Sequence, residues 1–197
     1  MVQPVEYLQQ LYLTAMAEGD PCARFVTLMT VDADGYPVSR MVTVRQFTAD
    51  EIAISVNMLS PKIRQLTAND KWELAGFWPQ SMTQFRLRGS YSLHCGAAEH
   101  SLWRNKPHAS QIMDLYAERV RQQSTEVASR AIMQQEVAQL TSQLEQLPQL
   151  PVAEHIGLLW LQPQMIELWQ QSDADRMHDR RLWCLQNGAW SESTLVP

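Results

Sequence analysis

The apolar and polar positions near the N-terminus alternate with the spacing of a helix. Between residues 5 and 17 the apolar members are Val5, Leu8, Leu11, Tyr12, Ala15 and Met16. This spacing is typical of a helix that buries one face. Gly19 and Pro21 follow, and both residue types act as helix stop signals. The pattern therefore predicts a first helix over 5–17.

From residue 24 to residue 93 the pattern changes to short segments of β type. Strands are predicted over 24–31, 38–47, 51–57, 72–77 and 84–93, and turn residues separate them. A short helix is expected to begin at Ser60-Pro61, because Ser is a good N-cap and Pro suits the first helical position. Strands at this spacing favour an antiparallel meander or barrel.

Residues 97–147 have helical spacing and few glycines or prolines, which predicts a helical insert with a long amphipathic stretch over 124–147. Short strands are expected again over 156–161, 165–169, 180–186 and 190–195, within a C-terminal region of about 156–197. Asn187-Gly188 is a strong hairpin signal. This order differs from the βαβ alternation of a nucleotide-binding parallel sheet. Neither the dinucleotide-binding nor the P-loop glycine motif occurs.

Composition narrows the class of protein. The 197 residues are 45% hydrophobic, which is enough for one core, so a single domain over 1–197 is expected. The net charge of −5 argues against a nucleic-acid partner. Three widely spaced cysteines support neither a disulfide framework nor a metal site. The start Met1 to Pro4 lacks a signal-peptide pattern, and no apolar run approaches the ~20 residues of a membrane span. A cytoplasmic protein without a membrane partner is expected.

Two places in the first half of the chain could bind an anion. Arg40 and Arg45 lie on one predicted strand, where positions five apart point to opposite faces unless a bulge intervenes. Ser60-Pro61-Lys62 combines a helix start with a cation, which is an anion-binding arrangement. The alternatives are surface charges for the two arginines and an ordinary capped helix for the second place.

Two further places could contact a ring or a reacting group. Gln84 shares a predicted strand with Arg86 and Arg88, and its amide can both donate and accept at a heteroaromatic edge. The segment from Arg176 to Arg180 contains two arginines and His178, which suit a phosphate and a reacting centre. The alternatives are a strand with one polar face and a charged surface loop. The histidines show no metal-binding spacing.

Taken in order, these residues resemble the pyridoxamine 5'-phosphate oxidase family. The resemblance rests on an ordered set of segments that runs from about residue 5 to the end, and Arg176-Met177-His178-Asp179-Arg180 is its most specific member. The other segments are 25–32, 34–37, 40–42, Asn57 with 60–62, Gln84, 106–112, Gln123-Ser124, 167–169, and Trp190 with Pro197.

The resemblance implies a mainly antiparallel β fold, an FMN-binding split β-barrel of Greek-key type with flanking α-helices, and a homodimer with FMN at its interface. The implied FMN contacts are Arg40, Arg45, Ser55, Val56, Ser60, Lys62, Gln84, Gln123, Ser124, Trp169 and Arg180. The implied substrate contacts are Arg45, Lys106, Ser110, Arg176 and His178, of which Arg176 and His178 form the catalytic pair.

The activity that the resemblance implies is oxidation of a phosphorylated B6 vitamer to pyridoxal 5'-phosphate. A hydride passes from the substrate C4' to flavin N5, and oxygen reoxidises the flavin. Several positions depart from the family pattern. Arg45 replaces a lysine, Ser55-Val56 a Tyr-Thr pair, Pro61 an arginine, Leu102 a tyrosine and Lys106 an arginine. These departures keep two alternatives open: a related split-barrel oxidoreductase or flavin reductase with another substrate, and a non-catalytic FMN-binding protein.

Overall fold

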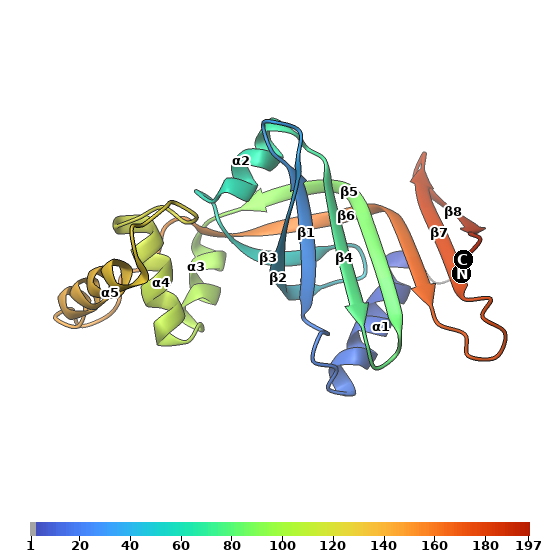
Figure 1. The fold of residues 1–197 in the computed structure, drawn as a ribbon, viewed down its shortest axis with the longest axis horizontal. Coiled ribbons are helices and arrows are strands. Elements are labelled where there is room, and N and C mark those ends of the chain that lie inside the picture. Colours follow the sequence, from blue (N-terminus) through green and yellow to red (C-terminus); the bar gives the residue numbers. More distant parts are fainter. Residues whose placement is uncertain (1–2) are drawn as a thin grey trace. The chain divides into compact units, whose positions relative to one another are not determined.

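A computed structural model describes residues 3–197 (Figure 1). Met1 and Val2, which open the segment considered for a signal peptide, lie outside the described residues. The helices are α1 (Pro4–Ala17), α2 (Pro61–Ala68), α3 (Ala97–Arg104), α4 (His108–Arg119) and α5 (Arg130–Leu144). The strands are β1 (Phe25–Val31), β2 (Pro37–Phe47), β3 (Ile52–Asn57), β4 (Trp72–Trp78), β5 (Thr83–His94), β6 (Ile156–Gln170), β7 (Asp179–Gln186) and β8 (Ala189–Thr194).

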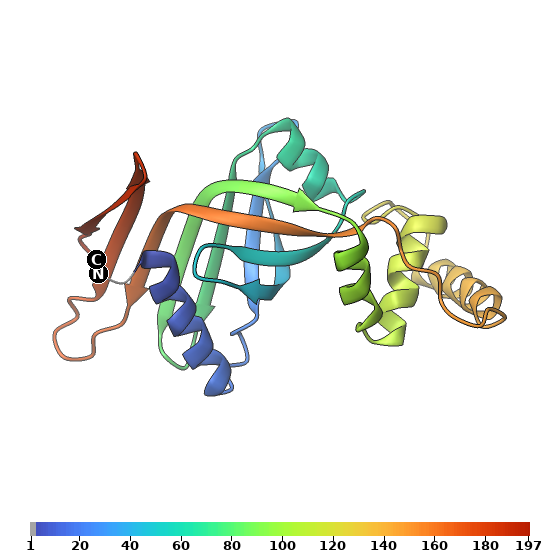
Figure 2. The same ribbon diagram turned by 180° about the vertical axis from the view of Figure 1, so that it is seen from behind.

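The strands form one sheet in the order β3-β2-β1-β4-β5-β6-β7-β8, and a pairing of β3 with β6 closes the first six strands into a barrel. The order β3-β2-β1-β4 is that of a Greek key. Strands β7 and β8 continue the sheet beyond β6 as a hairpin, as the view from behind shows (Figure 2). The predicted antiparallel barrel with flanking helices is confirmed.

On β1, β4 and the first half of β5, the residues that fill the barrel interior alternate along the strand. Leu28, Leu74 and Leu87 are fully buried, and burial of such a side chain contributes roughly 1.5–3 kcal/mol. The rings of Trp78 and Phe85 lie 4.7 Å apart. A Cβ at Gly76 would stand 2.2 Å from the Phe85 ring, so only glycine leaves room for that ring.

Two turns, at Gly35 and at Asn187-Gly188, have the backbone that their residues favour. Gly35 has φ +86°, and Asp32 Oδ1 accepts the N–H groups of Asp34 and Tyr36 across the same turn. Asn187 and Gly188 have φ values of +50° and +77°, and they form a two-residue loop between β7 and β8. Two positive φ values in a two-residue hairpin indicate a type I' turn.

The exception left open for Arg40 and Arg45 is present, since a register shift between Val44 and Gln46 places a bulge at Arg45 and breaks the ideal alternation. Two local predictions differ from the structure. Helix α5 covers only Arg130–Leu144 of the amphipathic stretch predicted over 124–147, and its start is fixed by Ser129 Oγ, which accepts the Ile132 N–H at 3.2 Å. The two strands predicted over 156–161 and 165–169 are one strand, β6.

Contacts between residues divide the chain into two compact units. The barrel unit comprises the chain up to Ser55, Gln65–Ser92 and Leu159–Pro197. The helical unit comprises Val56–Arg64 and Leu93–Leu158. The expectation of a single domain stays a prediction. The helical unit has its own core: Trp103, Ile112, Leu115, Tyr116, Leu140, Leu144, Ala153 and Ile156. No helix within residues 3–197 has both the length and the apolar character to cross a membrane.

Candidate functional site

Arg40 projects from β2 in the barrel unit and is held by three hydrogen bonds. Its Nη1 donates to Thr30 Oγ1 at 2.6 Å and to the Leu28 carbonyl at 3.4 Å, and its Nη2 donates to Gln65 Oε1 at 2.9 Å. Partial burial lowers the pKa of Arg40 from its ordinary value. A guanidinium has five N–H donors, so this one is oriented and still has donors to offer an anion.

Three further residues expected to contact FMN, on β2, β3 and β5, differ in how far they are exposed. Arg45 is exposed at the bulge of β2, which makes it a surface group of the barrel unit. Ser55 is half-buried on β3, and Gln84 is exposed near the start of β5. Gln84 lines a cavity of about 400 Å³ together with Arg86, and apolar side chains supply much of the remaining wall. The amide therefore lies on an open, partly apolar surface.

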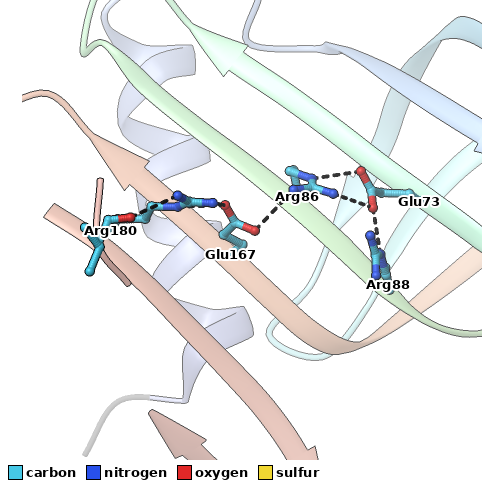
Figure 3. A network of polar contacts seen from close by, with 6 residues as sticks. Glu73, Arg86, Arg88, Glu167 and Arg180 are labelled. Carbon is cyan, nitrogen blue, oxygen red and sulfur yellow. Dashed lines mark hydrogen bonds and ion pairs between the residues drawn. The ribbon is translucent and has the colours of Figure 1, made fainter. Parts of the chain in front are cut away.

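Arg180 is anchored by a chain of charged groups that crosses β4, β5, β6 and β7 (Figure 3). Glu167 Oε1 accepts Arg180 Nε at 3.0 Å and Nη2 at 2.8 Å, and its Oε2 accepts Arg86 Nη1 at 3.3 Å. Arg86 also makes a two-bond contact with Glu73, at 2.9 and 3.0 Å. Arg88 Nε donates to the same carboxylate at 2.6 Å. We call these five residues the arginine–glutamate network.

The arginine–glutamate network joins three cations to two carboxylates. Burial is the largest single influence on the pKa of Glu73 and raises it, but hydrogen bonds and charge from Arg86 and Arg88 together lower it below the ordinary value. The hydrogen bond to Glu73 is the main reason that the pKa of Arg86 is raised. Both carboxylates therefore hold their arginines in fixed positions while one positive charge remains in excess.

The connection between β6 and β7 carries the predicted catalytic pair. His178 lies against Trp169 with ring centroids 4.8 Å apart and planes inclined by 56°. Trp169 and Arg180 are register partners across β6 and β7. Arg176 is exposed and has φ +58°, a left-handed backbone that is uncommon for a residue with a side chain. One end of this hairpin therefore brings together Trp169, His178 and Arg180.

The remaining predicted residues belong to the helical unit. Ser60 is completely buried, and its Oγ accepts Lys62 Nζ at 3.0 Å at the start of α2. Val56 is buried on β3, so its side chain packs in the core. Gln123 and Ser124 line a cavity of about 260 Å³, and Ser124 has φ +68°.

Lys106 has a close carboxylate partner. Its Nζ donates to Asp114 Oδ2 at 2.7 Å, and the same oxygen accepts Trp103 Nε1 at 2.9 Å. Ser110 is exposed on the first turn of α4. Asp114 is also part of the wall of the 260 Å³ cavity, so the charge of Lys106 is matched by a carboxylate at this wall.

A second ion pair stands at the same cavity. Arg121 lines the cavity and makes hydrogen bonds of 2.6–3.1 Å with Glu136, which also accepts the Tyr116 hydroxyl at 2.7 Å. The bonds from Arg121, followed by that from Tyr116, lower the pKa of Glu136 to about 2. This carboxylate is therefore ionised at all physiological pH values and compensates the charge of Arg121.

Sequence reasoning missed the acidic partners in both units. Glu73 and Asp114 were not singled out, and Glu167 entered only as part of the segment 167–169 of the resemblance, although each determines where a cation points. The available signal was the pair Arg86 and Arg88 at alternate positions of β5 with Glu73 on neighbouring β4, because arginines on one strand favour carboxylates on the next. Within residues 3–197, no group of three or more His, Cys, Asp or Glu residues is placed to hold a metal ion.

Both units carry donors of the kinds that bind a flavin phosphate or a flavin ring. The oriented Arg40 guanidinium and the Lys62 ammonium with buried Ser60 at a helix start are groups that bind a phosphate. The Gln84 amide and the anchored Arg180 offer directed donors of the kind that a flavin edge accepts.

Sequence comparisons identify relatives over almost the whole chain. Residues 6–95 match the family described as pyridoxamine 5'-phosphate oxidase, FMN-binding domain. The chain is 31% identical over 195 residues to the pyridoxine/pyridoxamine 5'-phosphate oxidase of Hyphomonas neptunium, covering 98% of this chain and 87% of that protein. It is also 31% identical to the enzyme of the same name from Pseudomonas paraeruginosa, covering 98% and 80%.

Solved structures show the same fold. PhzG from Burkholderia lata, crystallised with tetrahydrophenazine-1-carboxylic acid, superposes with a TM-score of 0.83 at 21% identity, covering 100% of this chain and 94% of that one. A pyridoxamine 5'-phosphate oxidase-related, FMN-binding protein from Nostoc punctiforme has a TM-score of 0.75 at 17% identity, with both chains fully covered. With its FMN-binding split barrel and relatives that are 31% identical over 98% of its length, this chain belongs to the pyridoxamine 5'-phosphate oxidase family.

Proposed function

We propose that this protein is an FMN-dependent oxidase that removes a hydride from a small ring substrate. The observation that carries the proposal is the end of the β6–β7 hairpin, where His178 packs on Trp169 beside the anchored Arg180. A rigid imidazole next to a fixed guanidinium suits a site that orients a substrate against a cofactor. A protein that only stores FMN has no need for this arrangement.

When bound, FMN supplies the redox chemistry by accepting hydride at N5 and passing electrons to oxygen. In the proposal, Arg40, Ser60 and Lys62 hold the cofactor phosphate. Gln84 and Arg180 orient the ring system, and Trp169, Gln123 and Ser124 complete its surroundings. Arg45, Ser55 and Val56 are proposed as peripheral contacts. The exposed Arg45 would reach the cofactor from the bulge of β2. Because the side chain of Val56 is buried, its contact would be made by the backbone of β3.

The first candidate substrate is a phosphorylated B6 vitamer, and the product is pyridoxal 5'-phosphate. Support comes from the relatives of that activity at 31% identity and from Ser110, Arg176 and His178, which suit the substrate side. In this proposal the working unit is a cytoplasmic homodimer with FMN at the interface of the two copies.

A second candidate is a related oxidation of a substrate without a phosphate. The observation that favours it is the ion pair between Lys106 and Asp114, with N and O 2.7 Å apart. A lysine that is already paired with a carboxylate attracts a phosphate dianion less strongly, because the carboxylate repels that charge. The exposed Leu102, at a position where the family has a tyrosine, removes one further polar group.

Turnover assays separate these candidates. The purified protein is reconstituted with FMN, cofactor binding is measured by flavin fluorescence, and hydrogen peroxide and aldehyde are followed. Pyridoxine and pyridoxamine 5'-phosphate are compared with their phosphate-free forms. Turnover of the phosphorylated pair supports the first candidate. FMN binding without turnover of either phosphate supports the second candidate, whereas failure to bind FMN would overturn both.

A further inference from the structure

The loop between β6 and β7 is tied together by hydrogen bonds that converge on Ser172. The backbone N–H of Ser172 donates to His178 Nδ1 at 3.1 Å. The hydroxyl of the same residue donates to Asp175 Oδ1 at 2.8 Å, and that oxygen also accepts the Met177 N–H at 3.0 Å. Ser172 therefore links the histidine to the aspartate, one through its backbone and the other through its side chain.

The contact with Ser172 determines which ring nitrogen of His178 carries the proton. A backbone N–H is always a donor, so Nδ1 must accept and cannot itself be protonated. The neutral imidazole then carries its hydrogen on Nε2. The Trp169 ring, with its centroid 4.8 Å away, limits rotation of the imidazole. The loop thus presents His178 as a hydrogen-bond donor at Nε2.

Asp175 also supports the backbone of Arg176. This arginine has φ +58°, which a residue with a Cβ adopts only when its surroundings hold it there. The Asp175 carboxylate accepts the Met177 N–H and so encloses Arg176 in a short side-chain-to-backbone turn. The hydrogen bond from Ser172, and after it that from Met177, hold the pKa of Asp175 below its ordinary value, so it is an ionised acceptor at neutral pH.

We propose that Asp175 is a positioning residue that, through Ser172 and Met177, orders the loop carrying Arg176 and fixes His178 with its proton on Nε2. The inference rests on the proposed function in one respect, namely that Arg176 and His178 face the substrate. It adds the chemistry of the group that His178 meets. That group must be a hydrogen-bond acceptor, such as a ring hydroxylate or another anionic oxygen, and a protonated amine at this point would be rejected.

Three variants of the full chain test the proposal. Asp175→Ala removes both accepted hydrogen bonds, whereas Asp175→Asn keeps a side-chain oxygen that can accept them. Asp173→Ala is the matched control, because it removes the same charge from the same loop. Asp173 accepts a hydrogen bond from the Gln171 side chain, and this bond involves neither Ser172 nor His178. Far-UV circular dichroism verifies that each variant folds.

The first readout is the ¹⁵N chemical shift of the two His178 ring nitrogens, measured at neutral pH without FMN or substrate and assigned with His178→Gln. We expect a protonated Nε2 and an unprotonated Nδ1 in the wild type, in Asp173→Ala and in Asp175→Asn. Asp175→Ala should show averaged shifts from a mixture of tautomers. A proton on Nδ1 in the wild type, or an unchanged pattern in Asp175→Ala, overturns the proposal.

The second readout is kinetic and uses the FMN-loaded protein with whichever substrate it turns over. Asp175→Ala should lower kcat by about tenfold or more, since misplacement of a positioned group is costly. Asp175→Asn should recover most of the loss, and Asp173→Ala should stay within about twofold of wild type. Equal losses in Asp173→Ala and Asp175→Ala would contradict the positioning role. If no tested substrate reacts, the proposed function fails, while the ring-nitrogen shifts still decide this inference.

Discussion

Glu167 is the residue through which Arg180 is anchored, and its replacement by glutamine tests the arginine–glutamate network. The carboxylate accepts two hydrogen bonds from Arg180 and one from Arg86. Its side chain is only 11% exposed. Glutamine has the same size, so Glu167→Gln leaves no cavity. It removes the charge and turns one acceptor into an NH₂ group that faces a guanidinium.

The size of the effect follows from burial and from the bonds lost. Hydrogen bonds to charged groups contribute roughly 1.5–3 kcal/mol each, and breaking a fully buried ion pair costs about 3–5 kcal/mol. Here the side chains of Arg86 and Arg180 are 33% and 31% exposed, so water stabilises them once they are unpaired. The remaining amide oxygen also keeps part of the contact with Arg180. We therefore expect a loss of about 2 kcal/mol in the free energy of unfolding.

Urea denaturation measures this loss, and thermal unfolding should show a Tm lower by roughly 4–8 °C for a chain of this size. Asp70→Asn is the control, because it breaks the ion pair between Asp70 and Lys71. The side chains of these two residues are 74% and 79% exposed, respectively. That exposed pair should contribute little. The reasoning would be refuted if Glu167→Gln lost no more free energy of unfolding than Asp70→Asn. We also expect Glu167→Gln, but not Asp70→Asn, to bind FMN more weakly.

Three other predictions follow from single contacts. Arg40→Ala and Lys62→Ala should each raise the Kd for FMN by about tenfold or more, because charge-assisted bonds contribute roughly 1.5–3 kcal/mol; unchanged fluorescence titrations for both would reject this placement of the phosphate. Gly89→Ala would bring a Cβ to 2.0 Å from the Gln162 carbonyl oxygen, so it should destabilise by about 2–3 kcal/mol, whereas Gly96→Ala, with 3.7 Å to its nearest atom, should have a much smaller effect in the same melting experiment. The pKa of Glu136 is lowered from 4.5 to about 2. Its contribution to stability is therefore complete above pH 4.5 and is lost as the pH falls through about 2. A carboxyl ¹³C titration of Glu136 with a midpoint near pH 4.5 would contradict this prediction.

The sequence by itself determined those features that depend on near neighbours in the chain. The helix before Gly19, the turn at Gly35 and the type I' hairpin at Asn187-Gly188 each follow from the backbone preferences of a few consecutive residues. The alternation of apolar residues likewise predicted most strands, because one face of each strand must be buried. The strand spacing left a meander and a barrel open, and the family resemblance added the split barrel and the cofactor.

The tertiary structure decided the partners of the charged residues. Glu73, Arg86 and Glu167 are far apart in sequence and meet because β4, β5 and β6 are neighbours in the sheet. The bulge at Arg45 and the continuity of β6 are also consequences of strand pairing. At the candidate site, the sequence supplied His178 and Arg176, whereas the folded loop decided that Asp175 would hold them. Pairing between distant residues depends on sheet register and loop geometry, which no short stretch of sequence contains.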